Sequence, residues 1–276
     1  MVHMLGDKKA VFVPVLILCF AVMFIPQIEM GKAQEQLNLT IKPDGSVEPD
    51  TDLLERNGTI YTLKGDIFGT IMVQKNGITI DGEGYTIEGG KEVSVRGVYL
   101  VGPDLSRPSC RDVLVTNLRI FNFYDGIFAV GSSNISIIGN SLENVGIHFL
   151  GGANITGNLV KHNNFTDAGV FIDYNKGGLD IITENNFING WVMVGLSDVP
   201  IVERNYWSDY KGADNDGDGT GDIPHTSSNI LDKEVQDNYP LMHPIPEFHS
   251  WTVLPLLITL VLAAIIYRKK LRKTPI

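Results

Sequence analysis

The chain has 276 residues, of which 29 are glycine and only two are cysteine, and its formal net charge is −10. This length suits one large domain, and residues 34–250 alone carry 14 basic and 30 acidic side chains. Because such a surface would repel a phosphate backbone, we expect no nucleic-acid partner. Cys19 lies within an apolar run near the start, so Cys110 has no internal disulfide partner.

Both ends of the chain have the composition of targeting segments. Residues 1–33 combine Lys8 and Lys9 with an apolar run and then small residues, which predicts a secretory signal peptide; an uncleaved anchor is the alternative. Residues 251–267 form a 17-residue apolar run, and residues 268–276 are basic. This pattern predicts a transmembrane helix with a cytoplasmic tail. The region between would then lie on the extracellular face of the cell membrane.

Residues 34–56 are polar and turn-rich, and we expect them to cap the amino-terminal end of the next segment. In residues 57–210, short β-branched runs alternate with Gly, Asn and Asp, and no helical periodicity appears. Residues 102–111 contain two prolines and read as an inserted loop. The chain is therefore predicted to be all-β across this region.

An asparagine returns at steps of 20 to 23 residues within the predicted strands. The positions are Asn117, Asn140, Asn163, Asn185 and Asn205. A unit of this length cannot bury its own apolar face, so neighbouring units must stack as a parallel β-solenoid. Equivalent side chains stack in such a fold, so we predict that the five asparagines form a structural ladder at one corner. Asparagine suits a corner because its amide groups bond to one another and its backbone tolerates the left-handed conformation.

These units resemble a known family. Residues 132–141 (SSNISIIGNS) and 205–210 (NYWSDY) are similar to the right-handed parallel β-helix proteins grouped with NosD, the accessory protein of nitrous oxide reductase. The stretches 214–222 and 237–241 resemble the close of archaeal surface proteins of that group. The similarity covers residues 57–242 and implies the right-handed twist of the solenoid. We predict a right-handed parallel β-helix of about seven coils.

The acidic loop at residues 211–225 has the oxygen spacing of a calcium-binding turn. The predicted ligands are Asp214, Asp216, Asp218, Asp222 and the carbonyl of Thr220. His225 stands where an EF-hand has a bidentate Glu, so we expect a looser calcium site with a further oxygen from Asp209 or Asp232. A solvated acidic loop without metal is the alternative.

A second candidate site follows the glycine in each unit. If Ile127, Ile147, Val170 and Trp191 point inward, strand alternation turns the next residue outward. The predicted outward stripe consists of Phe128, His148, Phe171 and Val192. Aromatic side chains on a sheet can stack on sugar rings, and the resemblance implies polysaccharide as a ligand of such faces. Two alternatives stay open: a loop covers the stripe, or the opposite register buries these residues.

Catalytic and copper-binding motifs are missing from the sequence. It contains no Gly-His-Gly and no Arg-x-Pro-x-x-Arg motif, so no catalytic residue is assigned, and His162 and Asp180 are expected to be solvated corner residues. Charged residues that could still converge in space are Asp125, Lys161, Asp167, Asp173, Glu184 and Arg204. Copper prefers clustered Cys, Met or His, whereas here only Met242 and His243 are adjacent.

The predicted carboxy-terminal stalk, residues 226–250, contains Pro246-Glu247-Phe248. This tripeptide with the apolar run and the basic tail resembles the PEF-type sorting signal read by archaeosortases; a plain membrane span is the alternative. The leading prediction is a surface-anchored binding or structural module, with envelope polysaccharide or envelope proteins as candidate partners. Two other classes stay open, a polysaccharide lyase, hydrolase or epimerase and a NosD-like accessory protein for a copper enzyme.

Overall fold

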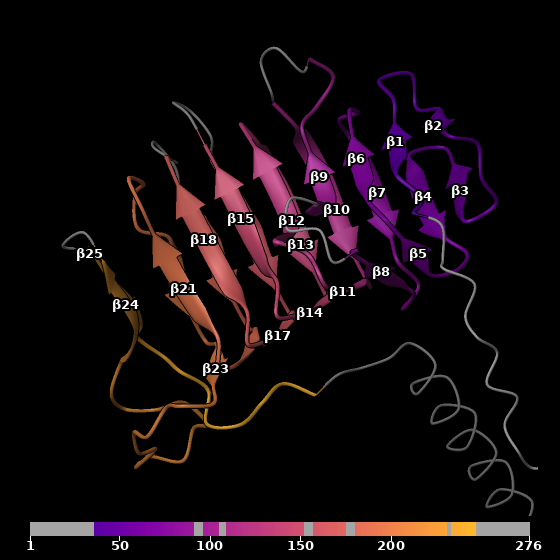
Figure 1. The fold of residues 1–276 in the computed structure, drawn as a ribbon. Helices are drawn as coiled ribbons and strands as arrows, with labels where there is room; N and C mark the ends of the chain where they lie inside the picture. Colours follow the sequence, from indigo (N-terminus) through magenta and orange to yellow (C-terminus); the bar gives the residue numbers. More distant parts are fainter. Residues whose placement is uncertain are drawn as a thin grey trace, which may run out of the picture. The chain divides into compact units, whose positions relative to one another are not determined.

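The computed structural model describes residues 36–90, 96–104, 109–151, 157–174, 180–230 and 233–246, all within one compact unit. The predicted signal peptide, transmembrane segment and basic tail lie outside these residues. No helix in the described ranges is long and apolar enough to cross a membrane. The described chain forms strands that lie in three sheets, here called A, B and C, and the strands of sheet A follow one another side by side from β1 to β21 (Figure 1).

The three sheets contain eight, ten and seven strands. Sheet A contains, in spatial order, β2 (Val47–Glu48), β1 (Leu39–Ile41), β6 (Ile71–Val73), β9 (Arg96–Leu100), β12 (Asp125–Val130), β15 (Gly146–Leu150), β18 (Gly169–Asp173) and β21 (Trp191–Val194). Sheet B contains β24 (His225–Ile230), β25 (Lys233–Asp237), β22 (Ile201–Glu203), β19 (Ile181–Thr183), β16 (Leu159–Lys161), β13 (Ser133–Ile138), β10 (Arg111–Thr116), β7 (Ile78–Asp81), β4 (Ile60–Leu63) and β3 (Leu54–Asn57). Sheet C contains β23 (Tyr206–Trp207), β20 (Asn186–Ile188), β17 (Asn164–Thr166), β14 (Ser141–Glu143), β11 (Arg119–Phe121), β8 (Thr86–Glu88) and β5 (Ile67–Phe68).

The chain visits sheets B, C and A in turn, and each strand pairs in parallel with its equivalent one turn later. The prediction of a parallel β-solenoid is therefore confirmed. Among the described residues there are six complete turns, from β4 to β21, followed by β22 and β23. The predicted count of about seven is one too high, because the chain after β23 enters the acidic loop and adds no further strand to sheet A.

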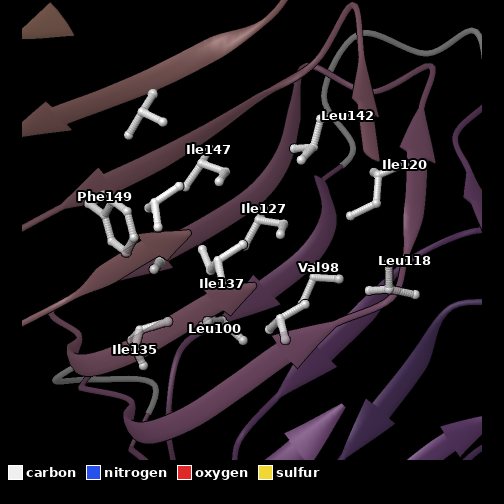
Figure 2. Packing of buried hydrophobic residues seen from close by; sticks show 14 of the residues in the cluster. Val98, Leu100, Leu118, Ile120, Ile127, Ile135, Ile137, Leu142, Ile147 and Phe149 are labelled. Atoms are coloured by element: carbon white, nitrogen blue, oxygen red, sulfur yellow. The ribbon is translucent and has the colours of Figure 1, made fainter. Parts of the chain in front are cut away.

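Strand alternation produces the core. Ile127, Ile147, Val170 and Val192 pair in one column and are at most 1% exposed. Figure 2 shows Ile127 and Ile147 among the buried aliphatic side chains inside the coil. The inward-facing side chains of sheet C form a second column, which ends in three stacked aromatic rings. The ring centroids of Phe165 and Phe187 are 4.7 Å apart, and those of Phe187 and Trp207 are 4.3 Å apart.

Antiparallel hairpins lie at both ends of the solenoid. The described residues of the predicted cap form β1, β2 and β3, and β3 pairs antiparallel with β4. At the other end, β24 and β25 form a hairpin, and Ser227 and Ser228 hydrogen-bond the main chain of Val192 on the last strand of sheet A. Open strand edges would recruit other chains, so these hairpins limit end-to-end association. The prediction of a stalk at residues 226–250 is therefore wrong for its first part, up to Asp237, because β24 and β25 extend sheet B.

A residue with left-handed backbone conformation lies at each of two corners of the turn. At the corner from sheet B to sheet C, it is the residue before the ladder position. There, φ lies between 53° and 70° at Asn117, Gly139, His162, Glu184 and Arg204. At the corner from sheet C to sheet A, φ lies between 50° and 63° at Asn122, Asn144, Asp167 and Asn189. Asparagine does occupy left-handed corners, as expected, but the buried asparagines of the repeat are not the residues that adopt this conformation.

Candidate functional site

The buried asparagines of the repeat form a continuous ladder along the solenoid. The side chains of Asn140, Asn163, Asn185 and Asn205 are each at most 1% exposed. Each Nδ2 donates to the Oδ1 of the next asparagine, at 3.0, 3.0 and 2.9 Å. Each Oδ1 also accepts a main-chain N–H from the turn before, and each Nδ2 also donates to a buried carbonyl. These amides therefore satisfy the main chain where it bends.

Asn117 does not belong to this ladder, contrary to the prediction. Its side chain is exposed and donates to Asp81 Oδ1 at 2.9 Å. The ladder position in that turn is held by Leu118, whose N–H donates to Asn140 Oδ1 at 3.0 Å. Asn117 instead occupies the left-handed corner position, one residue earlier. The nearly constant spacing of the repeat concealed this shift of one residue.

The ladder ends on a carboxylate that the repeat pattern does not include. Asp237 is 0% exposed and accepts the Nδ2 of Asn205 at 3.2 Å and the Trp207 Nε1–H at 3.0 Å. A second, shorter ladder has the same ending, because Asn158 Nδ2 donates to Asp180 Oδ1 at 3.0 Å. Asp180 is 5% exposed, so the expectation that it is a solvated corner residue is wrong. A carboxylate suits this position since it accepts only and donates nothing.

The outward stripe on sheet A continues across six strands. Its members, in register from β6 to β18, are Met72, Tyr99, Phe128, His148 and Phe171, and Met193 follows on β21. Successive ring centroids from Tyr99 to Phe171 are 5.6, 4.8 and 4.9 Å apart. The predicted register was wrong by one residue at its end: Trp191 pairs with Gly169, so that Val192 lies in the core and Met193 on the stripe.

Phe128 has a different role from the one predicted. Its side chain is only 4% exposed, so its face is not free for a ligand. The guanidinium carbon of Arg96 lies 3.9 Å from the Phe128 ring centroid and 4.8 Å from that of Tyr99. Tyr99, His148 and Phe171 are half-buried. The available surface of the stripe therefore consists of these three rings, the charged group above Phe128 and, at its two ends, the half-buried Met72 and Met193.

Three ionisable side chains gather beside the stripe. Asp125 is 8% exposed, and its Oδ2 and Oδ1 lie 3.6 Å from Arg96 Nε and from His148 Nδ1. The pairing register shifts between Asp125 and Ile127, which is the position of a β-bulge, and bulges redirect side chains. At 3.6 Å neither contact is a hydrogen bond, and among the described residues the buried atoms Arg96 Nε and His148 Nε2 have no hydrogen-bond partner.

The sequence repeat gives no signal for Arg96 and Tyr99, because the asparagine spacing begins only at Asn117. The signal that could have found them is the Gly97-Val98 pair, which matches the glycine and aliphatic residue of the later turns. Extending the repeat by one turn with this pair places Tyr99 beside Phe128 and Arg96 beside Asp125, as the strand pairing shows.

The other candidate charged residues do not converge on one site. Glu184 lies at the B–C corner within 2.8 Å of Lys161 Nζ and 2.7 Å of His162 Nε2, with Arg204 Nε at 3.9 Å. The hydrogen bond from Lys161, followed by that from His162, lowers the pKa of Glu184. Asp167 accepts from Asn189 at another corner, and Asp173 accepts from the main chain of Leu196. Lys161, Glu184 and Arg204 therefore meet in one partly exposed corner network, and Asp167 and Asp173 lie apart from it.

The acidic loop brings three of its predicted ligands together. The carboxylates of Asp214, Asp216 and Asp218 each offer an oxygen, and these atoms lie within 4.8 Å of one another. Main-chain N–H groups of the loop donate to them, for example Gly219 N to Asp214 Oδ2 at 3.0 Å. The hydrogen bonds from Thr220 lower the pKa of Asp218, so it is ionised at neutral pH.

Asp222, a fourth predicted carboxylate ligand, lies outside this cluster and accepts from the main chain and side chain of Asn215. Thr220 lies beside the cluster, since its N–H donates to Asp218 Oδ1 at 2.8 Å, and it bridges to Leu241. His225 begins β24, and its ring centroid lies 4.5 Å from that of Trp207. Burial lowers the pKa of His225, partly offset by Asp209 and Asp237. Asp232, named as a further ligand, lies outside the described residues.

The comparison with protein families identifies the chain. The model of the family described as periplasmic copper-binding protein (NosD) matches residues 68–213, more than half of the sequence. The chain belongs to the NosD family. Neither the curated proteins nor the solved structures contain a match to this chain. The archaeal character and the PEF-type signal suggested by the sequence stay predictions for this NosD-family chain.

The described residues of this NosD-family chain do not fit a copper site. Copper prefers thiolate, thioether and imidazole ligands that converge. Cys110 is 0% exposed, and burial raises the pKa of its thiol to about 12, so the thiolate is not available. His162 is hydrogen-bonded to Glu184, and the ring of His225 lies against Trp207. Across the described ranges, His, Cys, Asp and Glu side chains come together in threes only at the Asp214 cluster, which offers hard oxygen ligands.

Proposed function

We propose that the chain is an exported β-helix binding module whose outward stripe on sheet A binds envelope polysaccharide. The observation that supports this best is the column of half-buried rings, Tyr99, His148 and Phe171, in register along the solenoid. His148 and Phe171 lie on neighbouring turns, about 4.8 Å apart as in parallel strands, and Tyr99 lies two turns before His148, with the buried Phe128 between them. Such a surface suits an extended chain of sugar rings, because each aromatic ring offers an apolar face to the CH groups of a sugar. The periplasmic description of the family supports export.

Removing two rings of the stripe is expected to weaken glycan binding. For the double replacement Tyr99→Ala and Phe171→Ala, we expect an affinity loss of about tenfold or more, since each stacked ring contributes roughly 0.5–1.5 kcal/mol. Binding of the full chain to a panel of envelope polysaccharides by calorimetry measures this. The matched control is Tyr124→Ala, which removes a 70% exposed tyrosine outside the stripe. Equal binding by the double variant and the control would place the ligand elsewhere.

We also propose that the acidic loop binds calcium weakly. Three carboxylates and flexible glycine-rich backbone suit a site with a dissociation constant of about 10⁻⁴–10⁻³ M. Asp214→Asn with Asp218→Asn is expected to abolish the heat of calcium binding in calorimetry, because two of the three anionic ligands are lost. Asp52→Asn, an exposed acidic residue at the other end of the described chain, is the control. Absence of any heat with the unaltered chain at millimolar calcium would remove this part of the proposal.

Family membership favours a second candidate function, an accessory role for a copper enzyme as in the resemblance to NosD. The donor set described above argues against copper binding by the solenoid itself. Copper retained by the full chain after gel filtration, at one ion per chain, would favour this candidate over glycan binding. An enzymatic role is the third class, and turnover of an acidic glycan would support it, with Asp125 and His148 as the first residues to replace.

A further inference from the structure

Arg96 is the one cation placed on the stripe among the described residues. Its ion-pair partner, Asp125, lies beyond hydrogen-bond distance. The Arg96 side chain is 36% exposed, and its guanidinium carbon lies 3.9 Å from the Phe128 ring centroid. Its Nε lies 3.6 Å from Asp125 Oδ2 and has no hydrogen-bond partner among the described residues. Because Nε is buried, a ligand reaches this side chain at its terminal guanidinium nitrogens.

Asp125 and His148 hold this arrangement in place. Asp125 Oδ1 lies 3.6 Å from His148 Nδ1, and the His148 ring meets the Phe128 ring edge to face, at an interplanar angle of 81°. Asp125 therefore shares its charge between two neighbours and forms a close pair with neither. Arg96 is positioned by ring contacts and a long-range attraction, which leaves its planar fork of donors able to form a bidentate pair with a carboxylate.

We propose that the stripe recognises acidic sugars, with Arg96 binding the carboxylate of a uronate residue while the neighbouring rings stack on the sugar chain. This inference rests on the proposed glycan-binding function and adds the class of ligand. It also accounts for a cation on a face of an otherwise acidic protein, whose net charge of −10 would repel a polyanion unless a specific contact compensates. Arg96 is a binding residue, Asp125 is a positioning residue, and His148 contributes both its ring to the binding surface and a contact to Asp125.

The test compares an oligogalacturonate with its methyl ester, which has the same length and lacks the charge. By calorimetry on the full chain, we expect the acid to bind about tenfold more tightly than the ester. Arg96→Gln is expected to remove this preference, so that the acid and the ester bind this variant with equal affinity. Arg96→Lys keeps the charge without the bidentate fork and is expected to retain only part of the preference.

The matched control is Arg119→Gln, which removes an exposed arginine on sheet C and should preserve the preference. Melting curves of the variants confirm that each is folded. Equal affinity of the unaltered chain for acid and ester would overturn the inference and leave the proposed function standing, as would an Arg96→Gln variant that keeps the preference. Binding of neither oligomer nor any envelope polysaccharide would overturn both.

Discussion

Replacing Asp237 with alanine is expected to lower the free energy of unfolding by about 4 kcal/mol. Asp237 is 0% exposed and accepts five hydrogen bonds. The donors include the main-chain N–H groups of Arg204 and Asn205, at 3.0 and 2.8 Å. Alanine leaves these groups without an acceptor in a region where water has little access. The midpoint of urea unfolding, with the slope unchanged, measures the effect.

Asp237→Asn tests whether this position requires a carboxylate, because asparagine occupies every earlier position of the same ladder, from Asn140 to Asn205. There, each amide accepts on its oxygen and donates to the next rung. At Asp237 both oxygens face donors, so an amide NH₂ in either orientation opposes at least two N–H groups. We expect a loss of about 2 kcal/mol. Glu234→Ala, an exposed acid on the same strand, should change stability by less than about 0.5 kcal/mol. Stability of Asp237→Asn equal to that of Glu234→Ala would contradict the acceptor-only role.

The sequence was sufficient to predict the solenoid because every turn must meet the same packing requirement. Each turn needs an inward aliphatic column, and stacking fixes which positions recur, as the buried column of Ile137, Val160, Ile182 and Val202 shows. The two ends are not repeated, so the pattern carries no signal there. This is why the hairpin at His225–Asp237 was predicted to be a stalk and why Asp237 was missed, although it closes the ladder.

The candidate site was less predictable for a related reason. A one-residue shift exchanges the inner and outer faces of a strand, and spacing of 20 to 23 residues does not resolve such a shift. Asn117 and Val192 were assigned to the wrong positions in this way. The contacts of Arg96 with Phe128 and Asp125 depend on side-chain direction at a bulge, which sequence periodicity does not encode.

Asn163→Ala is expected to destabilise the chain by about 3 kcal/mol. Asn163 is 0% exposed and lies in the middle of the ladder. Its Oδ1 accepts the main-chain N–H and the Nδ2 of Asn140, at 2.9 and 3.0 Å, and its Nδ2 donates to Ile137 O at 2.8 Å. Alanine removes both functions, so buried groups of two neighbouring turns lose their partners at once. Urea unfolding measures the destabilisation, and hydrogen exchange at Asn140 should rise most.

Asn117→Gly is the matched control for this prediction, since the two asparagines are equivalent in the sequence repeat and differ only in the structure. Glycine accepts the φ of 56° at this position, and the substitution removes an exposed hydrogen bond to Asp81. We expect a change below about 1 kcal/mol. In the double variant Asn163→Ala with Asn185→Ala, the second substitution should destabilise less than it does alone, because the two amides share one hydrogen bond. Equal effects at Asn117 and Asn163 would show that stability follows the sequence repeat and that the buried ladder is not its cause.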